Sequence, residues 1–148
     1  MGTHYKGSDE EVAALNAFIK IMRASDSLNS RLYSIVSESG LTISQFGTLE
    51  ALWHLGPMCQ SELGKKLLKS GGNITMVIDN LEKRDLVKRE RSKTDRRFIS
   101  VHLTDEGKEL ISDVFPKHVK NIVDEFSILS PEEIQLFSDL CKKIGMKQ

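Results

Sequence analysis

The sequence predicts a mainly α-helical domain that carries one small β-hairpin. Apolar residues recur at helical spacing over long stretches at both ends of the chain, from about 8 to 39 and from 104 onward. Between residues 86 and 103 the period changes to two, because Ile99, Val101 and Leu103 alternate with polar residues. The 148 residues fit one domain, and 39% hydrophobic with 28% charged residues is typical of a globular chain.

Capping signals predict where the first two helices begin. A capping box places a hydroxyl and, three residues later, a carboxylate or amide where each satisfies a backbone N–H. Ser8 with Glu11 and Thr42 with Gln45 are expected to form such boxes. We expect Gly40 to end the first helix, at about residue 39, and Gly56-Pro57 to end the second.

The middle of the chain predicts a short helix, a turn and a second helix, followed by the hairpin. The short helix begins near Ser61, with Leu63, Leu67 and Leu68 inward, and Ser70-Gly71-Gly72 is the expected turn. The next helix, Asn73 to Arg84, has one apolar face, formed by Ile74, Val77, Ile78 and Leu81. Strands at 86–91 and 99–103 then flank a polar tip, and this two-stranded ribbon must lie against helices to be stable.

Two further helices complete the chain. Thr104 is expected to cap a long helix that extends to about Leu129 and is kinked by Pro116. Ser130-Pro131, with Glu133 at the third helical position, predicts the start of the last helix. We therefore expect one domain over 1–148, with a lobe at 41–103 between helical ends at 8–39 and 104–148.

The net charge of zero hides a strongly uneven distribution. From Ser61 to Arg97 there are 11 Lys plus Arg and 6 Asp plus Glu, a net of +5, whereas the remainder holds 10 basic and 15 acidic residues, a net of −5. Local charge decides where a polyanion docks, so this segment favours nucleic acid as a partner. The alternative is a basic face that is merely solvated.

Several function classes are disfavoured. The longest stretches without charge run 11 residues, too short for a membrane helix, and the N-terminus has no apolar signal core, which predicts a cytoplasmic protein. Cys59 and Cys141 are expected to be reduced thiols packed inside the fold. No metal-ligand spacing, paired nucleophile and base, or phosphate-binding loop is present, so we expect no enzyme, metal or cofactor.

The helix from Asn73 carries the residue types that suit DNA on the side opposite its apolar face. Small, amide and basic groups there favour contact with base edges and phosphates. The candidate DNA-binding residues of this helix and the preceding turn are Ser70, Gly72, Asn73, Thr75, Met76, Asn80 and Lys83. Asp79 on the same side would repel DNA, so we expect it to hold Lys83 or a hairpin arginine in place. The alternative is an ordinary amphipathic surface helix.

Four segments, in this order and spacing, resemble the multiple antibiotic resistance regulator (MarR) family. They are LTISQF (41–46), GPMCQSELGKKL (56–67), NITMVIDNLEKRDLVKR (73–89) and TDRRFISVHLTDEGKEL (94–110). The resemblance implies a winged helix-turn-helix repressor that binds a palindromic operator as a homodimer through the helices at 8–39 and 104–148. Asp85 stands where many relatives carry glycine, at modest conformational cost.

The same resemblance implies roles for the hairpin tip, the wing. In the family an arginine of this segment enters the minor groove and an aspartate orients it, which we carry to Arg97, with Arg96 second and Asp95 as the orienting residue. Lys93 is a further candidate DNA contact. A narrow minor groove attracts arginine because it concentrates negative potential. The alternative is a surface ion pair of little consequence.

Family members are commonly released from DNA by a small, often phenolic, ligand in a cleft between the dimer helices and the DNA-binding lobe. Weak candidates for such a site are Arg23, Trp53 and His54. For each residue a structural role is favoured over ligand binding: Trp53 in the core, His54 partly exposed on its helix, and Arg23 in an ion pair, for which Asp26 is one candidate partner. A second hypothesis for the whole chain is a protein-interaction module that uses the winged fold without specific DNA binding.

Overall fold

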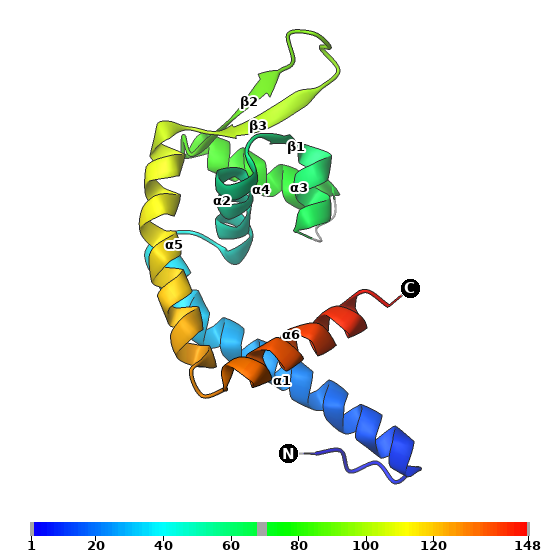
Figure 1. Ribbon diagram of the computed structural model, residues 1–148. Coiled ribbons are helices and arrows are strands. Elements are labelled where there is room, and N and C mark those ends of the chain that lie inside the picture. Colours follow the sequence, from blue (N-terminus) through cyan, green and yellow to red (C-terminus); the bar gives the residue numbers. More distant parts are fainter. Residues whose placement is uncertain (1, 68–70, 148) are drawn as a thin grey trace. The chain divides into compact units, whose positions relative to one another are not determined.

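The computed structural model describes residues 2–67 and 71–147, and within these ranges it contains six helices and three strands (Figure 1). The predicted mainly α-helical fold with a small hairpin is confirmed. No described helix combines the length and apolar composition needed to cross a membrane. The elements are α1 (Asp9–Glu38), α2 (Ile43–Leu55), β1 (Met58–Cys59), α3 (Gln60–Lys66), α4 (Gly71–Lys83), β2 (Val87–Arg91), β3 (Ile99–Leu103), α5 (Asp105–Phe126) and α6 (Pro131–Gly145).

The predicted capping groups lie where the sequence indicates. Thr42 Oγ1 accepts from Gln45 N at 3.1 Å while Gln45 Oε1 accepts from Thr42 N at 3.0 Å, and α2 starts there. The boxes at Ser8 and Ser130 are made in the same way before α1 and α6. Short-range side-chain chemistry therefore sets most helix starts.

The sheet has three strands rather than the predicted two. β1 joins the hairpin, giving the order β1-β3-β2 with both pairs antiparallel, and Val101 is opposite Met58 on one side and Arg89 on the other. A strand of two residues has no periodicity to read, so the sequence did not predict it. β1 makes β3 the central strand and attaches the hairpin to the start of α3.

Two helix boundaries differ from the prediction. α4 begins at Gly71, so Gly71 and Gly72 belong to its first turn and not to a preceding turn. The first N–H groups of a helix have no partner within it, which lets glycine occupy this end at low cost. Ser70 and Leu68 lie outside the described residues. α5 continues through Pro116 and ends at Phe126, three residues earlier than expected; the kink at Pro116 stays a prediction.

The chain divides into two units, of which residues 35–120 form one. We call this unit the central unit. It contains α2 to α4, the sheet, the end of α1 and most of α5, and it holds every buried apolar side chain among the described residues. These are Val36, Leu41, Phe46, Leu49, Leu52, Met58, Leu63, Ile74, Ile78, Leu81, Leu86, Val87, Val101, Ile111 and Val114.

The other unit, the terminal unit, consists of the described residues before 35 and after 120. None of its described residues is buried. Arg31 and Glu125 form a bidentate ion pair, with Nε 2.9 Å from both carboxylate oxygens, beside a hollow of about 360 Å³. Its exposed large apolar residues include Phe18, Ile21, Met22, Tyr33, Val123, Ile128, Ile134, Leu136, Phe137, Leu140, Ile144 and Met146.

Backbone atoms meet closely where α5 begins. Thr104 Oγ1 accepts from Gly107 N at 3.0 Å, as its predicted capping role requires, and Thr104 N donates to Leu86 O at 3.2 Å. A Cβ on Gly107 would lie 2.0 Å from Leu86 O. Asp85, before this contact, has φ +57°, the left-handed conformation that the sequence anticipated for it. Gly107 is therefore required for α5 to pack on the entry to β2.

We expect Gly107→Ala to lower the free energy of unfolding by about 3 kcal/mol, because a backbone oxygen cannot move aside as a flexible side chain does. Urea unfolding followed by circular dichroism measures this loss. Gly72→Ala is the matched control: an added Cβ there would meet no described atom within 4 Å. An equal effect of the two substitutions would contradict the steric explanation.

Candidate nucleic-acid interface

α4 buries one face and exposes the other, as its sequence predicts. Ile74, Ile78 and Leu81 are fully buried against α2, α3 and the sheet, and Val77 is half-buried. The opposite face presents the candidate DNA-binding residues: Gly72, Asn73, Met76, Asn80 and Lys83 are exposed, and Thr75 is half-buried. Ser70, the remaining candidate before this helix, is not among the described residues. The exposed face offers amide, small and basic groups to a partner.

The side chain of Arg89, on β2, joins the hairpin to α4. Its Nη2 donates to Asp79 Oδ1 at 2.6 Å and its Nη1 to Glu82 Oε1 at 2.9 Å. The backbone N of Arg89 also donates to Glu82 Oε2 at 3.1 Å. The expectation that Asp79 holds a basic residue is confirmed, and the residue held is a hairpin arginine rather than Lys83.

Gln60 extends this cluster to the start of α3. Its Oε1 accepts from Arg89 Nη2 at 3.4 Å, and its Nε2 donates to Thr75 Oγ1 on α4. Side chains from α3, α4 and β2 thus form one connected network beneath the exposed face of α4. Gln60, Glu82 and Arg89 were not predicted from the sequence, where the one signal for them was the negative charge of Asp79 on a side of the helix expected to face DNA.

The wing arginine is held by the wing aspartate. Arg97 donates from Nε to Asp95 Oδ1 at 3.1 Å and from Nη2 to Oδ2 at 3.0 Å, and its backbone N donates to Oδ1 at 3.0 Å. These hydrogen bonds lower the pKa of the Asp95 carboxyl below its ordinary value, and the side-chain bonds from Arg97 have a larger effect than the backbone bond. The carboxylate therefore stays charged. The Arg97 side chain is nevertheless 87% exposed. Asp95 fixes the direction of Arg97 while its outer surface remains accessible.

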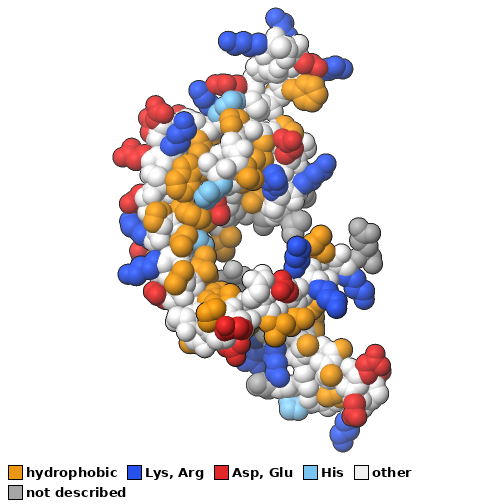
Figure 2. Space-filling view, viewed as in Figure 1, with side chains coloured by type: hydrophobic (Ala, Val, Ile, Leu, Met, Phe, Trp, Pro, Cys, Tyr) orange, Lys and Arg blue, Asp and Glu red, His pale blue; other side chains and the backbone are white. Residues whose placement is uncertain are grey.

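The hairpin projects beyond the helices of the central unit (Figure 1), and Lys and Arg side chains gather at its end (Figure 2). Lys93 and Arg96 are both exposed there. Backbone bonds close the tip: Ser92 N donates to Phe98 O at 2.9 Å, and Phe98 N donates to Asp95 O at 3.1 Å. Phe98 itself is 63% exposed, and the sequence reasoning did not single it out.

The three weak ligand candidates lie in different units. Arg23 lies on α1 in the terminal unit, whereas Trp53 and His54 lie on α2 in the central unit. No ion pair joins Arg23 to Asp26 within the described residues, so that expectation was wrong. Trp53 is 37% exposed rather than in the core, and its ring contacts the Phe115 ring edge-on, with centroids 5.6 Å apart.

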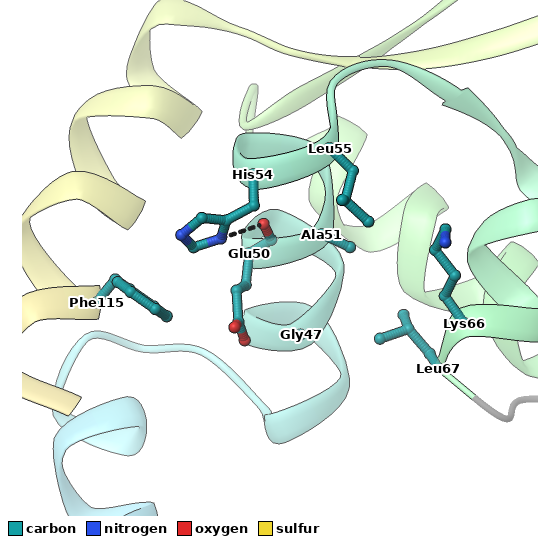
Figure 3. Close-up of a pocket in the computed structure, with 8 residues that line it drawn as sticks. All are labelled: Gly47, Glu50, Ala51, His54, Leu55, Lys66, Leu67 and Phe115. Atoms are coloured by element: carbon teal, nitrogen blue, oxygen red, sulfur yellow. Dashed lines mark hydrogen bonds between the residues drawn. The ribbon is translucent and has the colours of Figure 1, made fainter. Parts of the chain in front are cut away.

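His54 lines a hollow of about 390 Å³ in the central unit (Figure 3). The other lining residues are Gly47, Glu50, Ala51, Leu55, Lys66, Leu67 and Phe115. Figure 3 shows Phe115 of α5 on one side of α2 and Lys66 and Leu67 at the end of α3 on the other. His54 Nδ1 donates to Glu50 O at 3.0 Å, and its ring lies 4.7 Å from that of Phe115. The hollow therefore combines an aromatic wall with one cation and one carboxylate.

Both cysteines are half-buried rather than packed in the core. Cys59 caps α3, its N donating to Glu62 Oε2 at 3.0 Å, and its Sγ is 3.1 Å from Ser61 Oγ. Cys141 lies on α6, where no described residue is buried, so neither thiol has the enclosed setting that the sequence suggested.

Comparison with known proteins identifies the family. The family model for the transcriptional regulator SarA/Rot matches residues 31–114, which is more than half of the chain. The HTH-type transcriptional regulator MhqR of Bacillus subtilis is 35% identical over 133 residues, which cover 90% of this chain and 92% of MhqR.

Solved structures agree with this match. AbsC, a MarR family transcriptional regulator from Streptomyces coelicolor, aligns with a TM-score of 0.81 at 26% identity over 95% of both chains. BpsR of Bordetella bronchiseptica, whose DNA binding is regulated by 6-hydroxynicotinic acid, aligns with a TM-score of 0.71 at 25% identity, covering 85% of this chain and 98% of BpsR. With its exposed α4 face and its Asp95-held wing arginine, the chain belongs to the MarR family of winged helix-turn-helix transcriptional regulators.

Proposed function

We propose that this protein binds a pseudopalindromic DNA operator as a homodimer and represses transcription from it. The observation that carries the proposal is the Arg89 network. It links the hairpin that carries the basic wing to α4, whose exposed face suits the major groove. A single α-helix fits the major groove, and a hairpin beside it reaches the adjacent minor groove.

In this arrangement α4 reads the major groove. Asn73 and Asn80 suit adenine, and Thr75 suits a thymine methyl or a phosphate. Lys83, in the last turn, pairs with phosphate. Gly72 and Met76 let the helix approach the bases closely, and Ser70 is assigned to the same surface from the sequence alone. Because Arg89 pairs with both Asp79 and Glu82, it offsets one of their two negative charges and reduces their repulsion of the DNA backbone.

The wing supplies the minor-groove contact. Arg97 inserts into the groove, oriented by Asp95, while Arg96 and Lys93 bind the phosphates beside it. Bidentate bonds restrict the Arg97 side chain before DNA arrives, so less conformational entropy is lost on binding.

A second copy of the chain covers the apolar surface of the terminal unit. Its described residues expose large apolar side chains on α1, the end of α5 and α6 and bury none, a pattern of residues that pack on a partner. A two-fold dimer also presents two copies of α4 to half-sites about one helical turn apart, which is why the operator is pseudopalindromic. The helices at 8–39 and 104–148 are assigned this dimerisation role.

A small aromatic acid releases the protein from DNA by binding in the hollow beside His54. The Phe115 and His54 rings offer stacking surfaces, and Lys66 offers a cation to a carboxylate or phenolate. Leu67 follows α3 directly and α3 packs against α4, so a ligand that shifts this residue acts on α4. The regulation of BpsR by 6-hydroxynicotinic acid supports a ligand of this class.

A protein-interaction module without DNA binding is the less supported function. Such a module needs an apolar groove beside α4, whereas the described face of α4 is exposed and mostly polar or small, with Met76 its one large apolar residue. The basic wing adds a charge pattern that favours a polyanion.

We expect Arg97→Ala to weaken operator binding at least tenfold and to reduce the slope of log affinity against log salt by about 1, because one cation no longer displaces counterions. The measurement is a mobility shift over a salt series with a duplex selected by the protein from a random library. Lys108→Ala on α5, which removes one exposed charge elsewhere, should change neither quantity. Sedimentation should show the same dimer for all three proteins. Unchanged affinity for the Arg97 variant would remove the wing assignment.

Arg89→Met should weaken operator binding about tenfold, because Asp79 and Glu82 then face DNA with uncompensated charge. Arg89→Met combined with Asp79→Asn should recover about threefold of that loss, since one of the two carboxylates is neutralised. Fluorescence anisotropy with the selected duplex gives both values, and thermal melting verifies that the variants fold. If the double variant binds no better than the single one, repulsion is not the cause.

Lys66→Ala should abolish the release of the protein by an aromatic acid while leaving binding without the acid nearly unchanged. We would screen phenolic acids and 6-hydroxynicotinic acid for a compound that lowers wild-type operator affinity about tenfold, a coupling of ordinary size. Lys65→Ala is the matched control, because Lys65 is exposed on the same helix but does not line the hollow. Equal release of the Lys66 and wild-type proteins would contradict this ligand site.

A further inference from the structure

Phe98 is a large apolar residue whose side chain lies mostly exposed at the end of the hairpin. The residue follows the wing arginine directly and is 63% exposed. The last cross-strand pair of the hairpin is Arg91 with Ile99, so Phe98 lies beyond the ladder and outside the alternation that buries Val101. No other ring contacts Phe98 among the residues that the structure describes.

The bonds that close the wing involve only the backbone of Phe98. Its N–H donates to Asp95 O and its carbonyl accepts from Ser92 N, and any residue except proline could make both. Burying a phenylalanine side chain fully is worth about 2 kcal/mol, and at 63% exposure the isolated chain gains only part of this stabilisation. Most of the ring is therefore open to contact with a partner.

The charges around Phe98 indicate the chemistry of that partner. Basic side chains dominate the tip, as Figure 2 shows at the end of the hairpin, and they are Arg91, Lys93, Arg96 and Arg97. The two nearby carboxylates are already occupied, since Asp95 binds Arg97 and Glu90 binds Lys88 at 2.9 Å. A surface that is cationic with one aromatic ring suits a polyanion that also offers apolar atoms, and DNA does so through its deoxyribose carbons.

We propose that Phe98 is a DNA-contacting residue whose ring packs against the deoxyribose wall of the minor groove that Arg97 enters. This inference rests on the proposed DNA-binding function and adds to it an apolar contact in the wing. Arg97 and Phe98 are consecutive, so a groove that accepts one side chain brings the other to its wall. The ring releases no counterions, so its contribution to affinity does not depend on salt.

The test compares Phe98→Ala, Phe98→Leu and Arg97→Ala on the selected duplex over a salt series. We expect Phe98→Ala to lower affinity about tenfold with an unchanged salt slope, whereas Phe98→Leu keeps most of the affinity and Arg97→Ala reduces the slope by about 1. Ile43→Ala is the matched control, because Ile43 is an exposed apolar residue of the central unit on α2 and not on the hairpin. Its affinity should equal that of the wild type.

A spectroscopic measurement locates the contact directly. Trp53 is the one tryptophan of the chain, so Trp53→Phe with Phe98→Trp places a single emitter in the wing. We expect the selected duplex to quench its emission and protect it from iodide. If Phe98→Ala binds like the wild type, or the emitter stays accessible to iodide in the complex, the inference fails and the DNA-binding function stands. If the wild type selects no sequence, the proposed function itself fails.

Discussion

The guanidinium group of Arg89 links the two candidate DNA-contacting elements of this protein, α4 and the hairpin. Arg89 reaches from β2 to Asp79 and Glu82 on α4 and to Gln60 at the start of α3, so three elements meet at one side chain. A two-stranded ribbon is marginal on its own, and the direction of the wing depends on what anchors its base. Because the guanidinium is a planar fork, it fixes angles as well as distances, which a lysine ammonium at the same place would not do.

The central unit buries apolar side chains, whereas the described residues of the terminal unit bury none. The central unit has a closed core from Val36 to Val114 and offers polar, charged surfaces at α4 and the wing. The terminal unit has capped helices and the Arg31–Glu125 ion pair that joins α1 to α5, but its described side chains enclose no core. Helices of this kind gain most of their stability from packing on other helices. The terminal helices lack such packing among their own described residues, whereas the helices of the central unit have it.

The sequence predicted what depends on neighbours a few residues away. Capping boxes such as Thr42 with Gln45 and the apolar face of α4 are local patterns, and each lies where it was expected. The alternation in β3 predicted the strand correctly, but of its three apolar residues only Val101 is buried, and Ile99 is 38% exposed. The strand β1 has only two residues, too few to show the alternation by which a strand is predicted. Trp53 matches the helical spacing of Leu49 and Leu52 and still lies at the surface, because spacing gives the angular position of a residue but not how far the core extends. Arg89 and Phe98 could not be predicted, since their importance lies in contacts, or in a lack of contacts, that only the folded chain defines.

The contact of Gly107 with Leu86 has a mechanical consequence. Two backbones touch there with no side chain between them, so the first turn of α5 and the entry to β2 have no soft layer that could absorb a displacement. A rotation of this end of α5 is passed to the hairpin as a rigid-body movement, whereas contacts through long side chains would dissipate it by changes of rotamer. The first turn of α5 and the entry to the hairpin therefore move together within the central unit.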